Sequence, residues 1–206
     1  MNSSESDSDR KKWLFNKIQD MPFIKTEIPD LLIYEPRVFH DTRGYFFESY
    51  NKNSFANEDI SHVFVQDNQA QSTYGVIRGL HFQNDPHAQT KLVRALLGTI
   101  RDVVVDLRKG SPTYGKSFSI DLSAENKKQL LVPKGFAHGY AVLSPVAEVM
   151  YKCDAFYNKE SEGGLLFNDP ALQIDWGIPV EKALVAEKDL LNPHLADCRH
   201  EFLYRP

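Results

Sequence analysis

Cysteine is scarce in this chain of 206 residues, because Cys153 and Cys198 are the only two. They show no CxxC spacing, so the sequence excludes a disulfide-stapled scaffold and offers no cysteine-based zinc or redox motif. We therefore expect two free thiols in a reducing cytoplasm.

Long apolar runs are also lacking, and the longest extend over a few residues, such as VVV at 103–105. A membrane-spanning helix needs about 20 apolar residues, so none is expected. The first residues, MNSSESDSDRKK, are polar and lead into no apolar stretch of the length found in signal peptides. These absences predict a cytoplasmic protein that is neither secreted nor inserted in a membrane.

An excess of positive charge is the third absence, since the formal net charge is −4. Proteins that bind nucleic acids broadly present basic surfaces, so we expect no nucleic-acid partner. An anionic ligand would have to be held by a local group of cations. The chain is long enough to bury one sizeable core but short for two, and we expect a single domain.

Short strand-like runs dominate what is present. They are rich in Val, Ile, Leu, Phe and Tyr, are separated by Gly, Pro, Asn and Asp, and include LLIYEP, HVFVQDNQ, GVIRGLHFQ, SFSIDLS and AEVMYKCDAFY. This spacing is typical of an all-β sandwich or barrel. We expect one domain over 23–206 after an extension at 1–22, in which residues 1–12 have a disordered composition and WLFNKIQDM could form a short helix or a pairing arm.

Three local expectations follow from the pattern. The one clear helix candidate is NKNSFANEDI at 51–60. In the run 102–108, Val103, Val105 and Leu107 alternate with Asp102, Val104, Asp106 and Arg108, as expected of a strand with two different faces. The tail at 188–206 is the least strand-like part of the domain, and we expect it to pack over one end of the barrel.

A small β-barrel can hold one ligand in its mouth, and its inward-facing residues alternate along every strand. Polar residues of one parity are therefore candidates for a site. Gln66 and Asn68 share a parity, as do Tyr151 and Tyr157. A solvated outer face for the amides, and packing with a wet hydroxyl for the tyrosines, are the alternatives.

Basic residues cluster in RGLHFQNDPHAQTKLVR, which holds Arg78, His81, His87, Lys91 and Arg94. A lysine near a histidine disfavours the protonated imidazole, so His81 could act as a neutral base near pH 7. Lys91 would offer positive charge to a developing oxyanion. The alternative is that both are ordinary polar residues of a sheet.

A metal site is a further alternative, because small barrels of this type often carry a His-x-His pair. Here the second position is glutamine, in His81-Phe82-Gln83, although PKGFAHGY keeps the Pro-x-Gly-x-x-His form of a second metal-binding stretch. Zinc or iron needs at least three protein ligands, which His81, His87 and His138 would have to supply. A degenerate cupin without metal is the interpretation that we prefer.

Several long stretches carry a family resemblance: VFVQDNQAQSTYGVIRGLHFQ, QTKLVRALLGTIRDVVVDLRKGSPTYGK, LSAENKKQLLVPKGFAHGY and AEVMYKC. With flanking similarity they cover about 24–189, and together they resemble the dTDP-4-dehydrorhamnose 3,5-epimerase family. The resemblance implies a cupin-like jelly-roll barrel with a few short helices, a strand-exchanged homodimer, and neither a metal nor an organic cofactor.

The implied substrate is a dTDP-linked 4-keto-6-deoxyhexose, epimerised at C3 and C5 through an enolate. This chemistry needs a base, an acid on the opposite face, and positive charge at the C4 oxygen. The resemblance assigns the base to His81 of RGLHFQ, its orienting carboxylate to Asp189 of AEKD, enolate stabilisation to Lys91 of TKLVR, and proton donation to Tyr151 of VMYK.

Substrate binding is implied at a second set of residues. Those in DTRGYFFE are expected to reach across from the partner subunit: Arg43, Phe46 and Glu48. The remainder are Gln66, Asn68, Arg78, His138, Tyr157 and Lys188. A pyrophosphate favours cationic partners and a thymine ring favours an aromatic face.

Arg78 and His81 have opposite parity, so a regular strand would aim them at opposite faces. Gly79 between them predicts a bulge or a local twist that re-aims one of them. An outward-facing Arg78 on a regular ladder would remove it from the site.

Two other functions stay open on the sequence alone. One is a single epimerase, acting at C3 or C5 in another dTDP-deoxysugar pathway, which could use the same base and lysine. The other is a non-catalytic sugar-nucleotide-binding cupin, which would have no need of base, carboxylate and acid together. A metal-dependent cupin oxygenase would require bound metal.

Overall fold

The computed structural model describes residues 22–58 and 60–206. The predicted behaviour of residues 1–12 and of WLFNKIQDM at 13–21 concerns positions outside this range. In the part of the chain that is described, no helix is long and apolar enough to cross a membrane.

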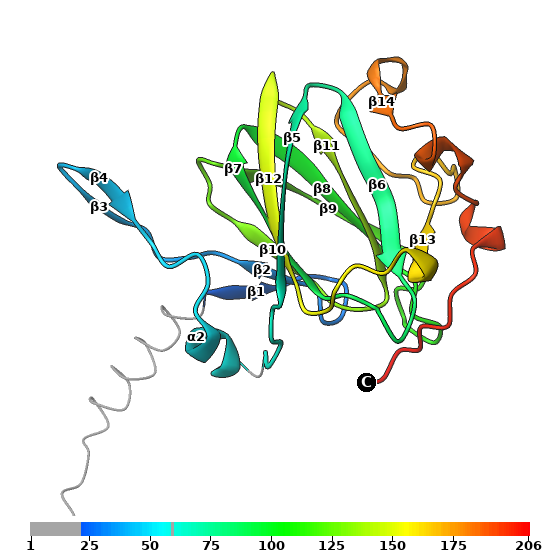
Figure 1. Ribbon diagram of the computed structural model, residues 1–206, viewed down its shortest axis with the longest axis horizontal. Coiled ribbons are helices and arrows are strands. Elements are labelled where there is room, and N and C mark those ends of the chain that lie inside the picture. Colours follow the sequence, from blue (N-terminus) through cyan, green and yellow to red (C-terminus); the bar gives the residue numbers. More distant parts are fainter. Residues whose placement is uncertain (1–21, 59) are drawn as a thin grey trace, which may run out of the picture.

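Two β-sheets face each other and form the body of the molecule (Figure 1). The first sheet has the order β1 (Phe23–Lys25), β2 (Leu32–Tyr34), β10 (Gln129–Val132), β7 (Lys91–Leu97), β12 (Val146–Cys153) and β5 (Gln66–Thr73). The second has the order β13 (Glu162–Gly164), β6 (Val76–Gln83), β11 (Phe136–Val142), β8 (Thr99–Asp106) and β9 (Ser117–Ser123), with β14 (Leu184–Val185) parallel to β6. The predicted all-β, cupin-like class is confirmed.

Part of the space between the sheets is filled by an apolar cluster, which includes Val93, Val104, Leu122, Phe136 and Val149. These residues come from both sheets, as expected where alternate side chains of facing strands interdigitate. The cluster fixes the distance between the two walls that carry the polar site residues.

Strand β8 is buried on both faces. Val104 points into the cluster between the sheets, whereas Val103, Val105 and Leu107 belong to a second cluster on the outer face of their sheet. The alternation seen in the sequence is thus real, but from Asp102 to Asp106 neither face of β8 meets water.

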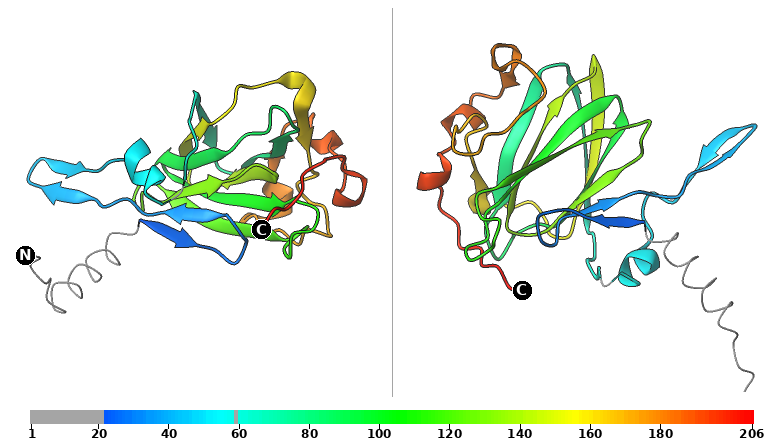
Figure 2. Two further views of the ribbon diagram at one scale, coloured as in Figure 1. Left: turned by 90° about the horizontal axis from the view of Figure 1, so that it is seen from below. Right: turned by 180° about the vertical axis from the view of Figure 1, so that it is seen from behind.

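The chain after β13 covers that outer face. Leu165, Phe167, Trp176 and Phe202 pack on it, and the 3₁₀ helices η2 (Val180–Lys182), η3 (Asp189–Leu191) and η4 (Leu195–Asp197) lie in this segment. Figure 2 shows it on the β6 side of the molecule. The first part of the tail packs along this face, where Leu195 joins the cluster that β8 and β11 present. Its last residues lie at the end of the barrel where the chain leaves β8, because Lys109 shares backbone hydrogen bonds with Phe202 and Tyr204.

The predicted helix at 51–60 is present in a shorter form, as α2 (Lys52–Ala56). The Asn51 side chain accepts hydrogen bonds from the amides of Asn53 and Ser54, which is the usual capping arrangement. Phe55 is 1% exposed and packs with Phe23 and Tyr34 against the first sheet. A further 3₁₀ turn, η1 (Lys159–Ser161), precedes β13.

Strand β6 contains the predicted irregularity at Gly79. His81 is paired with His138 and Arg78 with Tyr140, so three steps on β6 match two on β11. Gly79 has a φ of +127°, and a Cβ added there would lie 2.5 Å from the Cα of Gly139. The bulge turns Arg78 and His81 toward the same cavity, so the condition for removing Arg78 from the site is not met.

A two-stranded hairpin, β3 (Phe39–Asp41) and β4 (Gly44–Phe46), projects from the body (Figure 1). On one face of the hairpin, the Lys127 ammonium lies 3.9 Å from the Tyr45 ring centroid. Phe46, of the other parity, is 68% exposed. Phe39 lies opposite Phe46 on the same face, and the Arg37 guanidinium is 4.9 Å from the Phe39 ring centroid. Both residues of this face stay more than half exposed.

Gly79→Ala is expected to lower the free energy of unfolding by more than about 3 kcal/mol, because backbone strain of about 1–3 kcal/mol adds to the clash with Gly139. Gly44 is a matched control: its φ is +130°, and an added Cβ would meet nothing within 4 Å. Gly44→Ala should therefore lose only the stability that backbone strain costs. Urea denaturation measures the free energy of unfolding of both variants. An equal loss of stability in the two would show that the clash with Gly139 does not contribute.

Candidate active site

A cavity of ≈340 Å³ opens between the two sheets. Its lining includes predicted residues from β6, β7, β11, β12 and the C-terminal segment: Arg78, His81, Lys91, His138, Tyr151, Lys188 and Asp189. A neighbouring hollow of ≈300 Å³ shares His81, Lys91 and Tyr151 with it. The two are therefore adjoining parts of one site.

His81 is held by a carboxylate. Its Nε2 lies 2.8 Å from Oδ1 of Asp189, whose side chain is only 5% exposed. In the neutral ring Nε2–H donates to the carboxylate, and the lone pair is then on Nδ1. Burial lowers the pKa of His81, the hydrogen bond and charge of Asp189 oppose this, and the charges of Lys91 and Lys188 lower it further. The net lowering favours a neutral imidazole near pH 7.

Lys91 lies in the same cavity, on β7 of the facing sheet. Burial lowers the pKa of its ammonium, while Cys153, Asp102 and Glu162 raise it. Its Nζ lies 5.8 Å from the centroid of the Tyr151 ring. A partly desolvated cation in this position acts strongly on any negative charge that forms in the cavity.

Tyr151 comes from β12 of the first sheet, and His81 from β6 of the second, so they stand on opposite walls. Burial raises the pKa of Tyr151 to about 12. The phenol is therefore fully protonated at neutral pH and available as a proton donor.

A second histidine–carboxylate pair lies next to the first. Asp102 is fully buried, and its two oxygens lie 3.1 and 3.0 Å from Nε2 of His138. Tyr140 also lines the cavity, and its buried hydroxyl has no hydrogen-bond partner among the described residues. Asp102 and Tyr140 were not predicted from the sequence, although Asp102 has the inward parity of Val104.

Arg78 reaches the cavity from the bulge, and its Nε donates to Ser72 Oγ over 3.0 Å. The side chain is largely exposed, as expected of a cation that meets an anionic ligand at the rim.

The neighbouring hollow contains the two predicted amide side chains and the second predicted tyrosine. Gln66, Asn68 and Tyr157 line it, and Gln66 Nε2 donates to Asn68 Oδ1 over 3.1 Å. Gln66 and Asn68 therefore both face inward from β5, as their shared parity indicated. Glu162, absent from the predicted set, accepts from the Tyr157 hydroxyl at 3.1 Å and from Lys188 Nζ at 3.3 Å.

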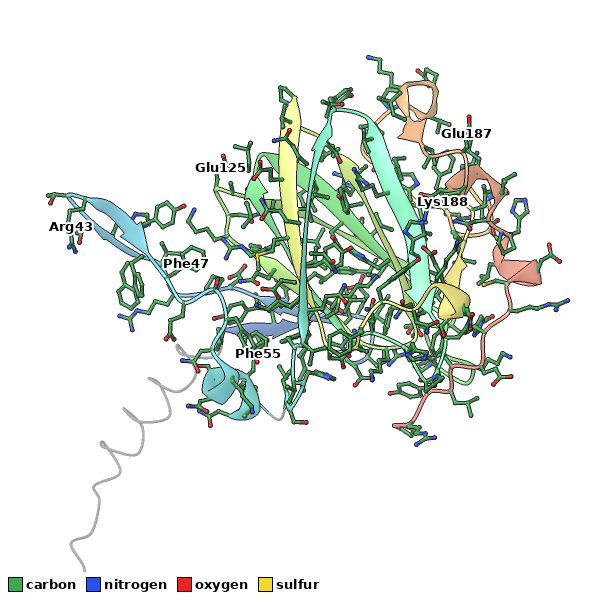
Figure 3. All side chains as sticks on the ribbon, viewed as in Figure 1. Arg43, Phe47, Phe55, Glu125, Glu187 and Lys188 are labelled. Atoms are coloured by element: carbon green, nitrogen blue, oxygen red, sulfur yellow. The ribbon has the colours of Figure 1, made fainter. Side chains whose placement is uncertain are left out.

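Three predicted residues are not brought to this site. Arg43 lies at the tip of the hairpin, 88% exposed at its side chain and paired with Asp41. Phe46 and Glu48 lie nearer its base. Figure 3 shows Arg43 and Lys188 on opposite sides of the molecule. Within one chain these three do not reach the cavity.

The geometry also bears on the metal alternative. Within residues 22–58 and 60–206, no group of three or more His, Cys, Asp or Glu side chains is placed to hold a metal ion. His81 and His138 are each paired with a carboxylate, and His87 lines neither hollow.

The family model for dTDP-4-dehydrorhamnose 3,5-epimerase matches residues 25–197. The enzyme of that name from Shigella flexneri is 52% identical over 178 residues, which are 86% of this chain and 97% of that protein. Among solved structures, the one from Elizabethkingia anophelis is 53% identical with a TM-score of 0.82, over 85% of this chain and 96% of that one. The Legionella pneumophila enzyme, crystallised with dTDP-4-keto-L-rhamnose, is 44% identical with a TM-score of 0.81, over 85% and 93%.

Replacing the carboxylate beside His81 should move the pKa of the imidazole downward. Asp189 raises this pKa, so Asp189→Asn leaves burial and the lysine charges unopposed. NMR titration of the imidazole carbons measures the change. Glu187→Gln removes the same charge from an exposed position two residues away and should leave His81 unaffected. An unchanged or raised pKa in Asp189→Asn would contradict the electrostatic account.

Proposed function

Because the chain belongs to the dTDP-4-dehydrorhamnose 3,5-epimerase family, we propose that His81, Lys91, Tyr151 and Asp189 carry out its reaction. The enzyme inverts C3 and C5 of dTDP-4-dehydro-6-deoxy-D-glucose and yields dTDP-4-dehydro-L-rhamnose, a step of dTDP-L-rhamnose biosynthesis. The observation that supports the residue assignment is the placement of a neutral imidazole and a protonated phenol on opposite walls, with a half-buried lysine in the same cavity.

Each inversion consists of two proton transfers. His81 takes the proton from the carbon next to the C4 ketone, and the electron pair of the broken C–H bond moves to the ketone oxygen as an enolate. Lys91 stabilises the negative charge on that oxygen. Tyr151 then donates its proton to the opposite face of the carbon, and solvent restores the starting protonation states. No redox cofactor is needed, because no electrons leave the sugar.

Asp189 orients the imidazole and stabilises its charged form once the proton has been taken, as a buried carboxylate does in other histidine dyads. His138, fixed by Asp102, contacts the sugar from the next strand.

The nucleotide extends from the edge of the first cavity into the neighbouring hollow. Its pyrophosphate is bound by Arg78 and Lys188, which line the first cavity, and its thymine ring by the Tyr157 face and the amides of Gln66 and Asn68 in the hollow. Lys188 and Tyr157 already share Glu162 as a partner, which holds them at the same edge.

The site is completed by a second copy of the chain. Arg43, Phe46 and Glu48 lie too far from their own cavity and belong instead to the partner's site in a strand-exchanged homodimer. The exposure of Phe39 (51%), Tyr45 (58%) and Phe46 (68%) supports this, since such an aromatic surface favours burial against another protein. We also propose that the enzyme works in the cytoplasm, where its two free cysteines stay reduced.

Deuterium exchange tests the assignment of base and acid. In D₂O the enzyme should label both C3 and C5 of the substrate, and His81→Ala should slow exchange at both carbons by about 10²–10⁴-fold. Tyr151→Phe should impair formation of inverted product more than loss of the substrate proton. NMR of the sugar measures each step.

His87→Ala and Tyr74→Phe are matched controls, because neither residue lines either hollow. Normal turnover by His81→Ala would refute the mechanism. Label at one carbon only would identify a single epimerase, and binding without any label would identify a sugar-nucleotide-binding protein.

Subunit mixing tests the shared site. Two variants are compared, the single variant His81→Ala and the double variant Arg43→Ala/Phe46→Ala. Each should be inactive alone, since the first lacks the base and the second lacks the hairpin residues that complete the partner's site. After the two are unfolded together and refolded, half of the dimers carry one copy of each, and one of their two sites has both His81 and an intact hairpin. Activity should then return to about a quarter of the wild-type value. No recovery would place Arg43 and Phe46 outside the partner's site.

A further inference from the structure

His81 and Asp189 are far apart in the chain, so something must fix their relative position. Both are bonded to the segment that begins at the last residue of β13. On one side, Gly164 is paired with His81, and Leu165 exchanges backbone hydrogen bonds with Leu80 (3.0 and 3.4 Å). On the other side, the amide of Leu166 donates to the carbonyl of Pro193 over 2.9 Å, four residues after Asp189. Residues 164–169 therefore connect the base to its carboxylate.

Asp169 is the side chain that makes this connection firm. It is 5% exposed, and its Oδ2 accepts from the amide of Leu195 at 2.7 Å. Its Oδ1 accepts from the amide of Ala171 at 3.0 Å and lies 3.3 Å from Nδ1 of His194. The carboxylate thus bonds its own turn and the start of η4 at the same time.

Burial alone would raise the pKa of Asp169, but the amides of Leu195 and Ala171, with His194, hold it below its usual value. The group is ionised at neutral pH. Bonds from amides to a charged carboxylate are roughly twice as strong as neutral ones. The contact at Leu195 is accordingly a strong tether for the residues after Asp189.

Apolar packing supplies little to hold η3 in place. Leu190 is 50% exposed and Leu191 is 84% exposed, so the two residues after Asp189 lie largely in water. Asn192 does lie against Gly164, where an added Cβ would be 2.5 Å from its side chain. The segment 189–195 is thus held by polar contacts to 164–169 and, at its end, by the packing of Leu195 on the outer-face cluster.

We propose that Asp169 is a positioning residue of the epimerase: it fixes the segment 189–195 against 164–169 and thereby holds Asp189 at hydrogen-bond distance from His81. This inference rests on the proposed role of His81 as the base. The dyad distance of 2.8 Å leaves little tolerance. A misplacement of about 1 Å in a catalytic group can cost about 100-fold in rate.

Kinetics of Asp169→Asn tests the proposal. The amide keeps one acceptor oxygen but turns an N–H donor toward an amide or His194, so the tether at Leu195 or Ala171 is lost. We expect kcat to fall by about 10–100-fold, with KM for the dTDP-sugar nearly unchanged. Asp175→Asn is a matched control in the same segment, where Asp175 bonds Arg101 and the amide of Gly177 away from the dyad, and it should keep wild-type kinetics.

The pH profile separates positioning from a loss of folded protein. Asp189 raises the pKa of His81, while burial, Lys91 and Lys188 lower it, and His138 is the cross-strand neighbour on β11. If Asp169→Asn withdraws Asp189, the acidic limb of kcat/KM should move to lower pH. A smaller folded fraction would scale the profile without moving it.

A double-mutant cycle tests whether Asp169 affects the reaction through Asp189. If Asp169 acts through Asp189, then Asp169→Asn should add almost nothing to the defect of Asp189→Asn. Additive defects, or an unshifted profile in Asp169→Asn, would overturn the inference. An unimpaired Asp189→Asn would instead refute the proposed role of the dyad itself, so the two failures are distinguishable.

A second variant covers the case in which Asp169→Asn does not fold. Leu195 is the first residue of η4 and follows the extended His194, a position that tolerates proline. Leu195→Pro removes the amide that donates to Asp169, whereas Leu195→Ala keeps it. The proline variant should show the lower kcat and the shifted profile and the alanine variant should not. Equal kinetics in the two would also overturn the inference.

Discussion

The close approach of two backbones, at Gly79 on β6 and Gly139 on β11, is the constraint on which the site depends. A Cβ at Gly139 would lie 2.7 Å from the carbonyl oxygen of Arg78, and one at Gly79 would lie 2.5 Å from the Cα of Gly139. Only glycine at both positions permits the bulge. Because of the bulge, Arg78 and His81 share a face, and His138 is brought opposite His81. Without it, either the cation or the base would point into the cover formed by the C-terminal segment.

Burial between the sheets then sets the protonation states. The same desolvation that lowers the pKa values of His81 and Lys91 raises that of Tyr151 to about 12. Both shifts favour the neutral forms of the imidazole and the phenol, which are the states that a base and an acid need at neutral pH. The carboxylate of Asp189 limits the first effect, so that His81 keeps enough basicity to remove a proton next to a ketone.

Much of the fold and site could be predicted from local sequence. Alternation revealed the strands, the parity of Gln66 and Asn68 matched the inward face, and the glycine between Arg78 and His81 indicated the bulge. The inward position of Asp102 was visible in its parity with Val104, but its pairing with His138 depends on the register of β8 and β11, which no local pattern encodes. Glu162 lies in a short edge strand whose three residues carry no periodicity. The course of the tail was predicted only for its last residues, which bond the loop after β8. Its earlier part packs along the sheet because β8 and β11 present apolar residues there, which its own composition does not reveal.

The hairpin β3–β4 raises a different question, because an isolated two-stranded hairpin is marginally stable in water. One face has a support in its own chain, where Lys127 lies against Tyr45 and Arg94 lies 5.1 Å from the ring centroid of Phe47. The other face, with Phe39 and Phe46, meets the Arg37 guanidinium but leaves both residues more than half exposed. In the proposed dimer that face is buried over the partner's nucleotide, so the contact that stabilises the hairpin also completes the site. Substrate binding and dimerisation would then stabilise each other, since each supplies surface that the other needs.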